Sequence, residues 1–183
     1  KGHETLFRAV KELNQDDIEI WVVGDKGTED RTVDVPALAR DLGLERQVAF
    51  FGKLSKTALK AVYRECDVFC LPSQTDRAGV AEGFPTVIAE AMAFGKPVIS
   101  TRHVEIPRVL PDILVDEGDV RALADAIRQV YSSEALRQRL GEQNRAIAHE
   151  IFSTNNARKT VQILQDTAAQ RTSTQPASLP EAV

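Results

Sequence analysis

Two carboxylates, Glu82 and Glu90, are separated by seven residues (83–89) that contain a glycine turn and the start of an expected helix. Pro85 suits the first helical position, because its missing N–H would have no partner there. Gly95 is expected to end this helix, and residues 97–100 form an expected buried strand. The pattern therefore predicts Glu82 in the loop before a helix and Glu90 within it.

The expected helix is apolar on every side of Glu90, which is typical of a buried helix. A lone carboxylate is costly in such a place unless another group satisfies it. The free N–H groups at the start of the helix form an anion site. These features predict a diphosphate at the helix tip, with polyol hydroxyls held by a carboxylate on either side. One alternative stays open: Glu82 as a solvated loop residue and Glu90 as a buried carboxylate paired with an arginine.

The rest of the chain alternates between expected strands and helices, which predicts an α/β fold with a parallel sheet and helices on both faces. Ser55 and Asp119 are expected to cap helices. The expected strands are 18–23, 48–51, 67–71, 97–100 and 113–115; the expected helices are 1–13, 35–42, 56–64, the one preceding Gly95, 119–131 and 134–165.

Four small residues stand at the ends of expected strands, namely Gly24, Gly52, Ser73 and Ser100. In open parallel sheets ligands bind at the carboxyl ends of the strands. The sequence therefore predicts a binding site along this edge, by an argument that does not depend on the two glutamates.

The length of 183 residues fits one domain, and the net charge of −4 gives no electrostatic reason to expect nucleic-acid binding. No apolar run is long enough for a transmembrane helix. Cys66 and Cys70 are interpreted as small core residues, because the further ligands that a zinc site needs are lacking. Two cysteines of this kind fit a reducing cytoplasm. Residues 167–183 are rich in polar and small residues and are expected to form a disordered tail.

The stretch EGFPTVIAEAMAFGKPVIST (82–101) resembles the signature of retaining, nucleotide-sugar-dependent glycosyltransferases of family 4, which have the two-domain GT-B fold. The resemblance extends over residues 1–164 and implies the C-terminal, Rossmann-like donor-binding domain, here 1–166. In that family a first strand, an arginine-bearing loop and an N-terminal domain precede Lys1. The resemblance therefore implies half of an enzyme, which alone should not transfer sugar.

The resemblance also implies roles for individual residues. Lys1 would contact the diphosphate, Glu82 the donor sugar and Glu90 the ribose hydroxyls, with Lys1 and Glu82 closest to catalysis. The backbone at Lys53 and Leu54 would meet the base edge. With the helix start, where the N–H groups of Phe84, Thr86 and Val87 are the expected donors, the predicted donor-binding set is Lys53, Leu54, Gly83, Phe84, Pro85, Thr86, Val87 and Glu90.

The resemblance implies hexosyl transfer from a UDP- or GDP-type sugar to a glycan or lipid-linked acceptor in polysaccharide biosynthesis, without a metal or other cofactor. The acceptor would bind the missing N-terminal domain, which could also provide peripheral association with the inner face of the membrane. Two alternatives stay open: the same fold making a soluble disaccharide or storage glucan, and a non-catalytic nucleotide-binding α/β domain.

The segment 102–108 departs from the family pattern. Many relatives carry Gly-Gly-Ile-Pro-Glu here, whereas this chain has Val104 and Glu105 in place of the glycines and Arg108 in place of the glutamate. His103 and Glu105 are expected near the sheet edge, where they would contact donor or acceptor; the alternative is a salt bridge of Glu105 within the loop. The loop 74–81 resembles the bacterial surface-polysaccharide subgroup.

Overall fold

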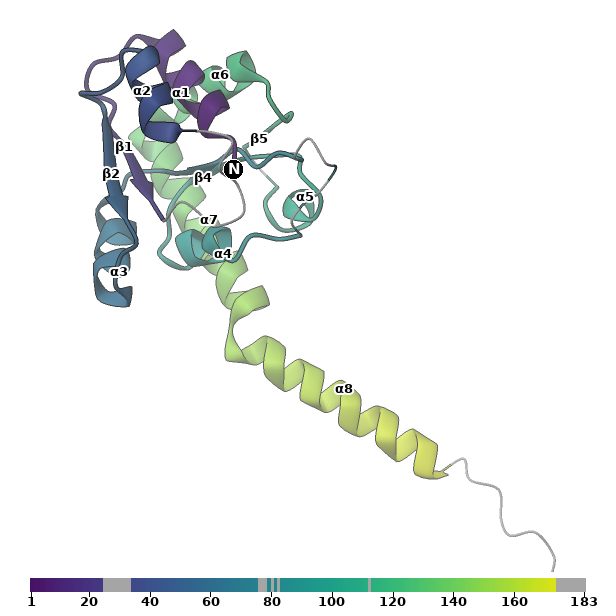
Figure 1. Ribbon diagram of the computed structural model, residues 1–183. Helices are drawn as coiled ribbons and strands as arrows, with labels where there is room; N and C mark the ends of the chain where they lie inside the picture. The colour runs from purple at the N-terminus through teal and green to yellow at the C-terminus, as the bar shows by residue number, and fades with distance from the viewer. Residues whose placement is uncertain (25–33, 76–78, 80, 82, 112, 174–183) are drawn as a thin grey trace, which may run out of the picture.

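The computed structural model describes residues 1–24, 34–75, 79, 81, 83–111 and 113–173. These form the α/β arrangement that the sequence predicted (Figure 1). In chain order the elements are α1 (His3–Leu13), β1 (Ile20–Val23), α2 (Val35–Asp41), β2 (Val48–Gly52), α3 (Lys56–Glu65), β3 (Phe69–Leu71), α4 (Thr86–Ala93), β4 (Val98–Thr101), α5 (Ile106–Val109), β5 (Leu114–Val115), α6 (Val120–Tyr131), α7 (Glu134–Phe152) and α8 (Thr154–Ser173).

All strand pairs are parallel, as predicted, but the strands of the described residues divide into two sheets. β1 pairs with β2, and β3-β4-β5 form the second sheet. A doubly wound sheet has the strand order 3-2-1-4-5-6. The two sheets correspond to the flanks of that order, and no described strand occupies the central first position. The single sheet implied by the sequence pattern is thus replaced by two flanking parts.

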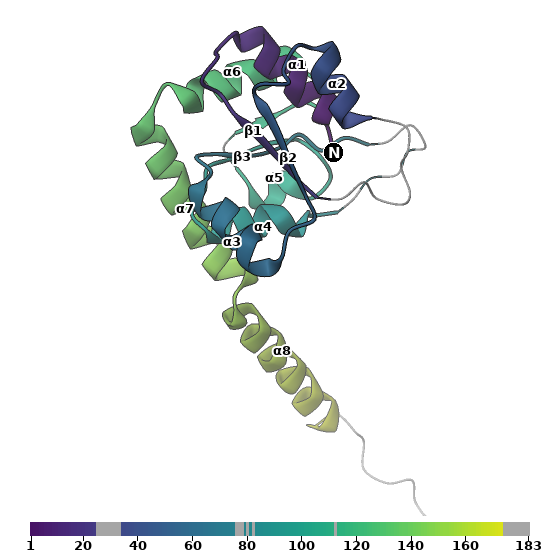
Figure 2. The ribbon, with the colours of Figure 1, turned by 60° about the vertical axis from the view of Figure 1, so that its left-hand side comes forward.

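Helices cover both faces of the strands. α1, α2 and α6 lie on one side, and α3, α4 and α7 lie on the other (Figures 1 and 2). β4 is buried along its whole length, with Ile99 in a core cluster with α1 and α6, and Val98 in a cluster with α4 and α7. Successive side chains of a strand point to opposite faces, so the alternation in β4 shows that the second sheet is covered on both sides.

Local signals in the sequence fix several helix ends. Ser55 accepts a hydrogen bond from the Ala58 N–H at 3.2 Å, and Asp119 accepts one from the Ala122 N–H at 2.9 Å, so both predicted caps are confirmed. Gly95 follows α4 with φ +70°, the left-handed conformation in which glycine avoids a Cβ clash. Pro85 is the cap of α4 rather than its first residue, because its ψ of 122° is extended.

The helix expected over 134–165 is two helices that meet at Ser153, which is extended. α8 leaves the body of the molecule and points away from it in both views (Figures 1 and 2). It continues to Ser173, so the predicted disordered tail is wrong for 167–173, where Ala168 and Ala169 favour a helix. Residues 174–183 of that tail lie outside the described residues.

Candidate functional site

The strand ends at the carboxyl edge are held together by side-chain hydroxyls. The Ser100 hydroxyl donates to the Leu71 carbonyl at 2.6 Å, and the Thr101 hydroxyl donates to the Ser73 carbonyl at 2.6 Å. All three hydroxyl residues, Ser73, Ser100 and Thr101, are buried. Ser100 therefore reinforces the edge from within, and the surface that faces a ligand must come from the segments that follow the strands.

The first turn of α4 carries backbone N–H groups that donate to none of the residues that the structure describes. The Ile88 N–H already donates to the Pro85 carbonyl at 3.0 Å, whereas the N–H groups of Phe84, Thr86 and Val87 donate to no partner among the described residues. Thr86 and Val87 are exposed. The donors expected from the sequence are thus available at a helix N-terminus, where an anion is stabilised.

The residues before α4 fix this turn to the core. Pro85 is buried, and the ring of Phe84 stacks on that of Phe152 with the ring centroids 5.3 Å apart. Gly83 is exposed. The side chain of Phe84 therefore has a packing role, and its backbone N–H is the part that could face a ligand.

Glu90 does not have the buried surroundings that the sequence predicted. It is exposed, as is Val87 one turn before it, while Ile88, Ala91 and Met92 take the core face of α4. The apolar composition of the helix misled the prediction, because an exposed valine looks the same in sequence as a buried one. The hydroxyl of Tyr63 on α3 donates to Oε2 of Glu90 at 2.9 Å, and no arginine pairs with it among the described residues.

Lys1 lies at the same edge because of the glycine that follows it. Gly2 has φ +76°, and a Cβ added there would lie 2.0 Å from the carbonyl oxygen of Pro72. Only glycine allows this approach of α1 to the exit of β3. The side chain of Gln74 also donates to the Thr5 hydroxyl at 2.6 Å. The structure thus places the exposed Lys1 beside the segment that leads from β3 towards α4.

Two further residues predicted to contact the donor, Lys53 and Leu54, lie in the turn between β2 and the Ser55 cap of α3, so both are at the carboxyl edge. Lys53 is exposed and Leu54 is half-buried. Glu82 lies outside the described residues, and its relation to Glu90 stays a prediction.

Both cysteines are free thiols, and Cys70 packs against the core as expected.

A cluster that the sequence did not reveal joins the ends of three strands. His103, fully buried after β4, places Nδ1 2.6 Å from Oε1 of Glu117, which follows β5. Glu117 also accepts from the N–H of Thr75, after β3, at 2.8 Å. This N–H and the His103 hydrogen bond hold the pKa of Glu117 below its usual value. Glu117 follows an expected strand end, which is the signal that could have revealed it.

The alternatives left open for the segment 102–108 are now resolved for Glu105. It forms an ion pair with Arg108 at 2.8 Å, and Arg102 pairs with Asp116 at 3.0 Å. The salt-bridge alternative is therefore confirmed with Arg108. His103 instead uses Nδ1 for Glu117, and its buried Nε2 has no hydrogen-bond partner among the described residues. Val104 adopts φ +39°, a conformation that is unfavourable for a β-branched residue.

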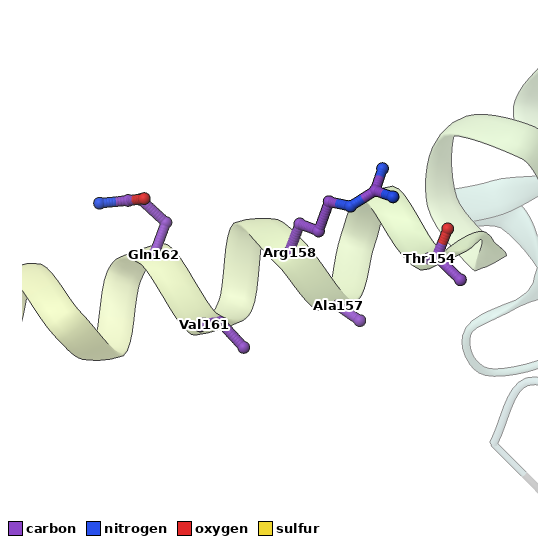
Figure 3. A pocket seen from close by; sticks show the side chains of 5 residues that line it. All are labelled: Thr154, Ala157, Arg158, Val161 and Gln162. Carbon is purple, nitrogen blue, oxygen red and sulfur yellow. The ribbon is translucent and has the colours of Figure 1, made fainter.

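Metal sites, membrane spans and a hollow on α8 do not offer a second functional centre among the described residues. No group of three or more His, Cys, Asp or Glu residues there could hold a metal ion, and metal independence stays a prediction. None of the described helices is both long and apolar enough to cross a membrane. A hollow on α8 is lined by side chains of that one helix, Thr154, Ala157, Arg158, Val161 and Gln162 (Figure 3).

Comparison with known proteins identifies the class to which this arrangement belongs. Residues 1–147 match the family described as "Glycosyl transferases group 1", and the chain belongs to that family. It is 32% identical over 150 residues to a D-inositol 3-phosphate glycosyltransferase of Corynebacterium diphtheriae, which covers 77% of this chain and 34% of the relative. It is 34% identical over 146 residues to a lipopolysaccharide core biosynthesis glycosyltransferase of Rhizobium meliloti, covering 78% and 39%. The chain thus spans about a third of the length of these relatives.

Solved structures agree with the fold. The Anabaena protein HepE, determined in complex with UDP, matches with a TM-score of 0.79 at 23% identity, over 91% of this chain and 45% of that one. A glycosyltransferase from Rickettsia africae matches with a TM-score of 0.79 at 26% identity, over 91% and 44%. A sucrose-phosphate synthase from Thermosynechococcus elongatus matches with a TM-score of 0.77 at 27% identity, over 93% and 43%.

Proposed function

We propose that this chain is the donor-binding domain of a retaining glycosyltransferase that transfers a hexosyl group from a nucleoside diphosphate sugar. The observation that carries the proposal is the pair of N–H groups on Thr86 and Val87, which donate to none of the described residues and lie one turn from the exposed carboxylate of Glu90. A diphosphate needs donors and a ribose diol needs an acceptor, and the first two turns of α4 offer both on neighbouring positions.

The reaction creates a strongly anionic nucleoside diphosphate, so catalysis depends on stabilising charge that develops on the leaving phosphate. The start of α4 would contribute about 0.3–1 kcal/mol to this. A charge-assisted contact from Lys1 would contribute about 1.5–3 kcal/mol. Gly2 supports this role, because it brings α1 against the exit of β3. We assign Glu82 to the donor-sugar hydroxyls.

We favour attack of the acceptor on the same face that the leaving group departs from, with the leaving phosphate taking the acceptor proton. Among the glutamates assigned to the site, Glu90 is committed to the ribose, and Glu82 is the one left as a nucleophile for double displacement. Same-face attack needs no such nucleophile and uses the charge stabilisation already present at the helix tip.

The donor is of the UDP or GDP type, and the acceptor is a glycan or lipid-linked sugar in polysaccharide biosynthesis. Relatives named for lipopolysaccharide core and amylovoran biosynthesis support the choice of acceptor. The acceptor would bind an N-terminal domain, which could also attach the protein to the cytoplasmic face of the membrane. We further propose that a strand preceding Lys1 fills the central position between β1 and β3 in the intact protein. The likeness to sucrose-phosphate synthase favours soluble disaccharide synthesis as the second candidate.

The experiment is a transfer assay of the intact protein with UDP-, GDP- and ADP-hexoses and a panel of glycan, lipid-linked and free-sugar acceptors. Coupling constants of the anomeric proton in the product report the configuration. We expect retention with one class of donor and loss of turnover in Glu90→Ala. An inverted product, or full activity of Glu90→Ala, would contradict the proposal. This chain alone should give no turnover with any pair.

A further inference from the structure

The chain has two tyrosines, and each donates a hydrogen bond to a carboxylate. Tyr131, at the end of α6, donates to Asp17 at 2.9 Å; both groups are exposed, and Asp17 precedes β1, at the amino edge of the strands. Tyr63 on α3 donates to Glu90 at 2.9 Å from a buried ring. The second pair brings a fixed donor to the one carboxylate that we assign to the nucleotide.

The ring of Tyr63 is held firmly. It stacks on Phe94, at the end of α4, with the centroids 5.3 Å apart and the planes at 15°, and it also contacts Phe69 of β3. Tyr63 is the buried residue of α3, and it joins the core cluster formed by α4, α7 and the second sheet. Its hydroxyl therefore has one defined position beside α4.

The Tyr63 hydroxyl donates its hydrogen bond mainly to Glu90. Its distance to Oε2 of Glu90 is 2.9 Å, and its distance to the Val87 carbonyl is 3.4 Å. Burial raises the pKa of Tyr63, and the hydrogen bond to Glu90 raises it further, so the hydroxyl stays a donor throughout the physiological range. A carboxylate has about four acceptor positions, and no described residue other than Tyr63 donates to the Glu90 side chain, so its other positions can accept from a ligand.

We propose that Tyr63 is a positioning residue for nucleotide binding: its hydroxyl holds the Glu90 carboxylate in the orientation that accepts both ribose hydroxyls. The proposal rests on the assignment of Glu90 to the ribose. An exposed glutamate loses much rotamer freedom when it binds a ligand, and a hydrogen bond made beforehand reduces that loss. Tyr63 thereby makes α3 part of the site, because the same helix begins at Ser55, directly after Lys53 and Leu54.

The test compares Tyr63→Phe, Glu90→Gln and the double variant in the intact protein. Tyr63→Phe removes the hydroxyl and keeps the ring. Tyr131→Phe is the matched control, because it removes the other tyrosine–carboxylate hydrogen bond. Calorimetry gives the affinity for UDP, GDP and ADP and for the 2′,3′-dideoxy form of the tightest of them. The ratio of the ribose to the dideoxy affinity isolates the hydroxyl contacts from the stability of the fold.

We expect Tyr63→Phe to weaken binding of the ribose nucleotide about 5-fold and to leave the dideoxy form unchanged. Tyr131→Phe should change neither, and Tyr63→Phe should add nothing in the Glu90→Gln background. If Glu90→Gln lowers the ribose preference and Tyr63→Phe does not, the positioning role is wrong and the proposed function stands. If Glu90→Gln keeps the preference, or no nucleotide binds, the assignment of Glu90 is wrong and Tyr63 loses its role with it.

Discussion

Glu90 and Glu117 both accept hydrogen bonds at the carboxyl edge of the strands, and they differ in how much of their capacity the protein uses. Glu90 is exposed and, among the described residues, receives one hydroxyl, that of Tyr63. Glu117 receives the Thr75 N–H and contacts Nδ1 of the buried His103. Glu117 therefore ties together the segments after β3, β4 and β5, whereas Glu90 keeps acceptor positions for a ligand. At this edge, the remaining acceptor capacity distinguishes Glu90, which we propose binds the donor, from Glu117, which holds the loops together.

The largest effect should come from Glu90→Ala. Two ribose hydroxyls lose a charged acceptor, so kcat/KM for the donor should fall about 100-fold, which corresponds to about 2.7 kcal/mol. The free energy of unfolding should fall less than in Glu117→Ala, because the Glu90 side chain is exposed and the Tyr63 hydroxyl keeps the Val87 carbonyl as an acceptor at 3.4 Å. Steady-state kinetics and urea unfolding measure the two quantities. Glu142→Ala, at an exposed position of α7, is the control, and an equal loss of kcat/KM in Glu142→Ala would show that the loss is not specific to Glu90.

Glu117→Ala should have the opposite balance of effects, with a larger loss of stability and a smaller loss of donor binding than Glu90→Ala. It leaves Nδ1 of the buried His103 without its partner, so the free energy of unfolding should fall by about 1–3 kcal/mol. Donor affinity should fall less than in Glu90→Ala. Chemical denaturation checks the first expectation and calorimetry the second. Glu117→Gln keeps an acceptor oxygen and should recover part of the stability; a fully stable Glu117→Ala would show that the cluster does not hold the edge.

Val104→Gly tests whether the segment that follows His103 has a structural role or contacts the ligand. Val104 is exposed and has φ +39°, which glycine adopts without strain. The free energy of unfolding should rise by about 1 kcal/mol while donor affinity stays the same. Thermal unfolding and calorimetry measure the two. A clear change of donor affinity would mean that this segment contacts the ligand and is not purely structural.

The smallest effect is a difference in pH dependence. The folded protein lowers the pKa of Glu117 from its ordinary value of 4.5, through the Thr75 N–H first and His103 second. The resulting stability is present above pH 4.5 and is lost as the pH falls through the lowered pKa of the folded state. Wild type and Glu117→Gln should therefore differ most near neutral pH and converge in acid. A stability difference that grows on acidification would contradict this.

The elements and their ends could be predicted because they depend on nearby residues. Ser55 and Asp119 cap helices through the third residue after them, and Gly95 ends α4 through its own φ. Gly83, Phe84, Pro85 and Thr86 indicated a helix start with open N–H groups for the same reason. The division into two sheets depends on which strands lie side by side, and that is a tertiary property.

The partners of the site residues could not be predicted, because they are distant in the chain. Tyr63 and Glu90 come from different helices, and Thr75, His103 and Glu117 from three segments after strands. The exposure of Glu90 was misjudged because composition does not show which face of a helix a neighbouring element covers. The segment at Val104 departs from the family pattern of paired glycines, and the strain there is visible only in the backbone angles.

The most direct test of the account is a titration of this chain with UDP and with GDP, in which NMR records the chemical shifts of the amide groups. Wild type and Glu90→Ala are compared. We expect shifts of the Thr86 and Val87 amides and at Lys53 with one nucleotide, and a loss of most of the affinity in the variant. Shifts confined to other surfaces, or equal affinity in both proteins, would show that the start of α4 and Glu90 do not form the donor site.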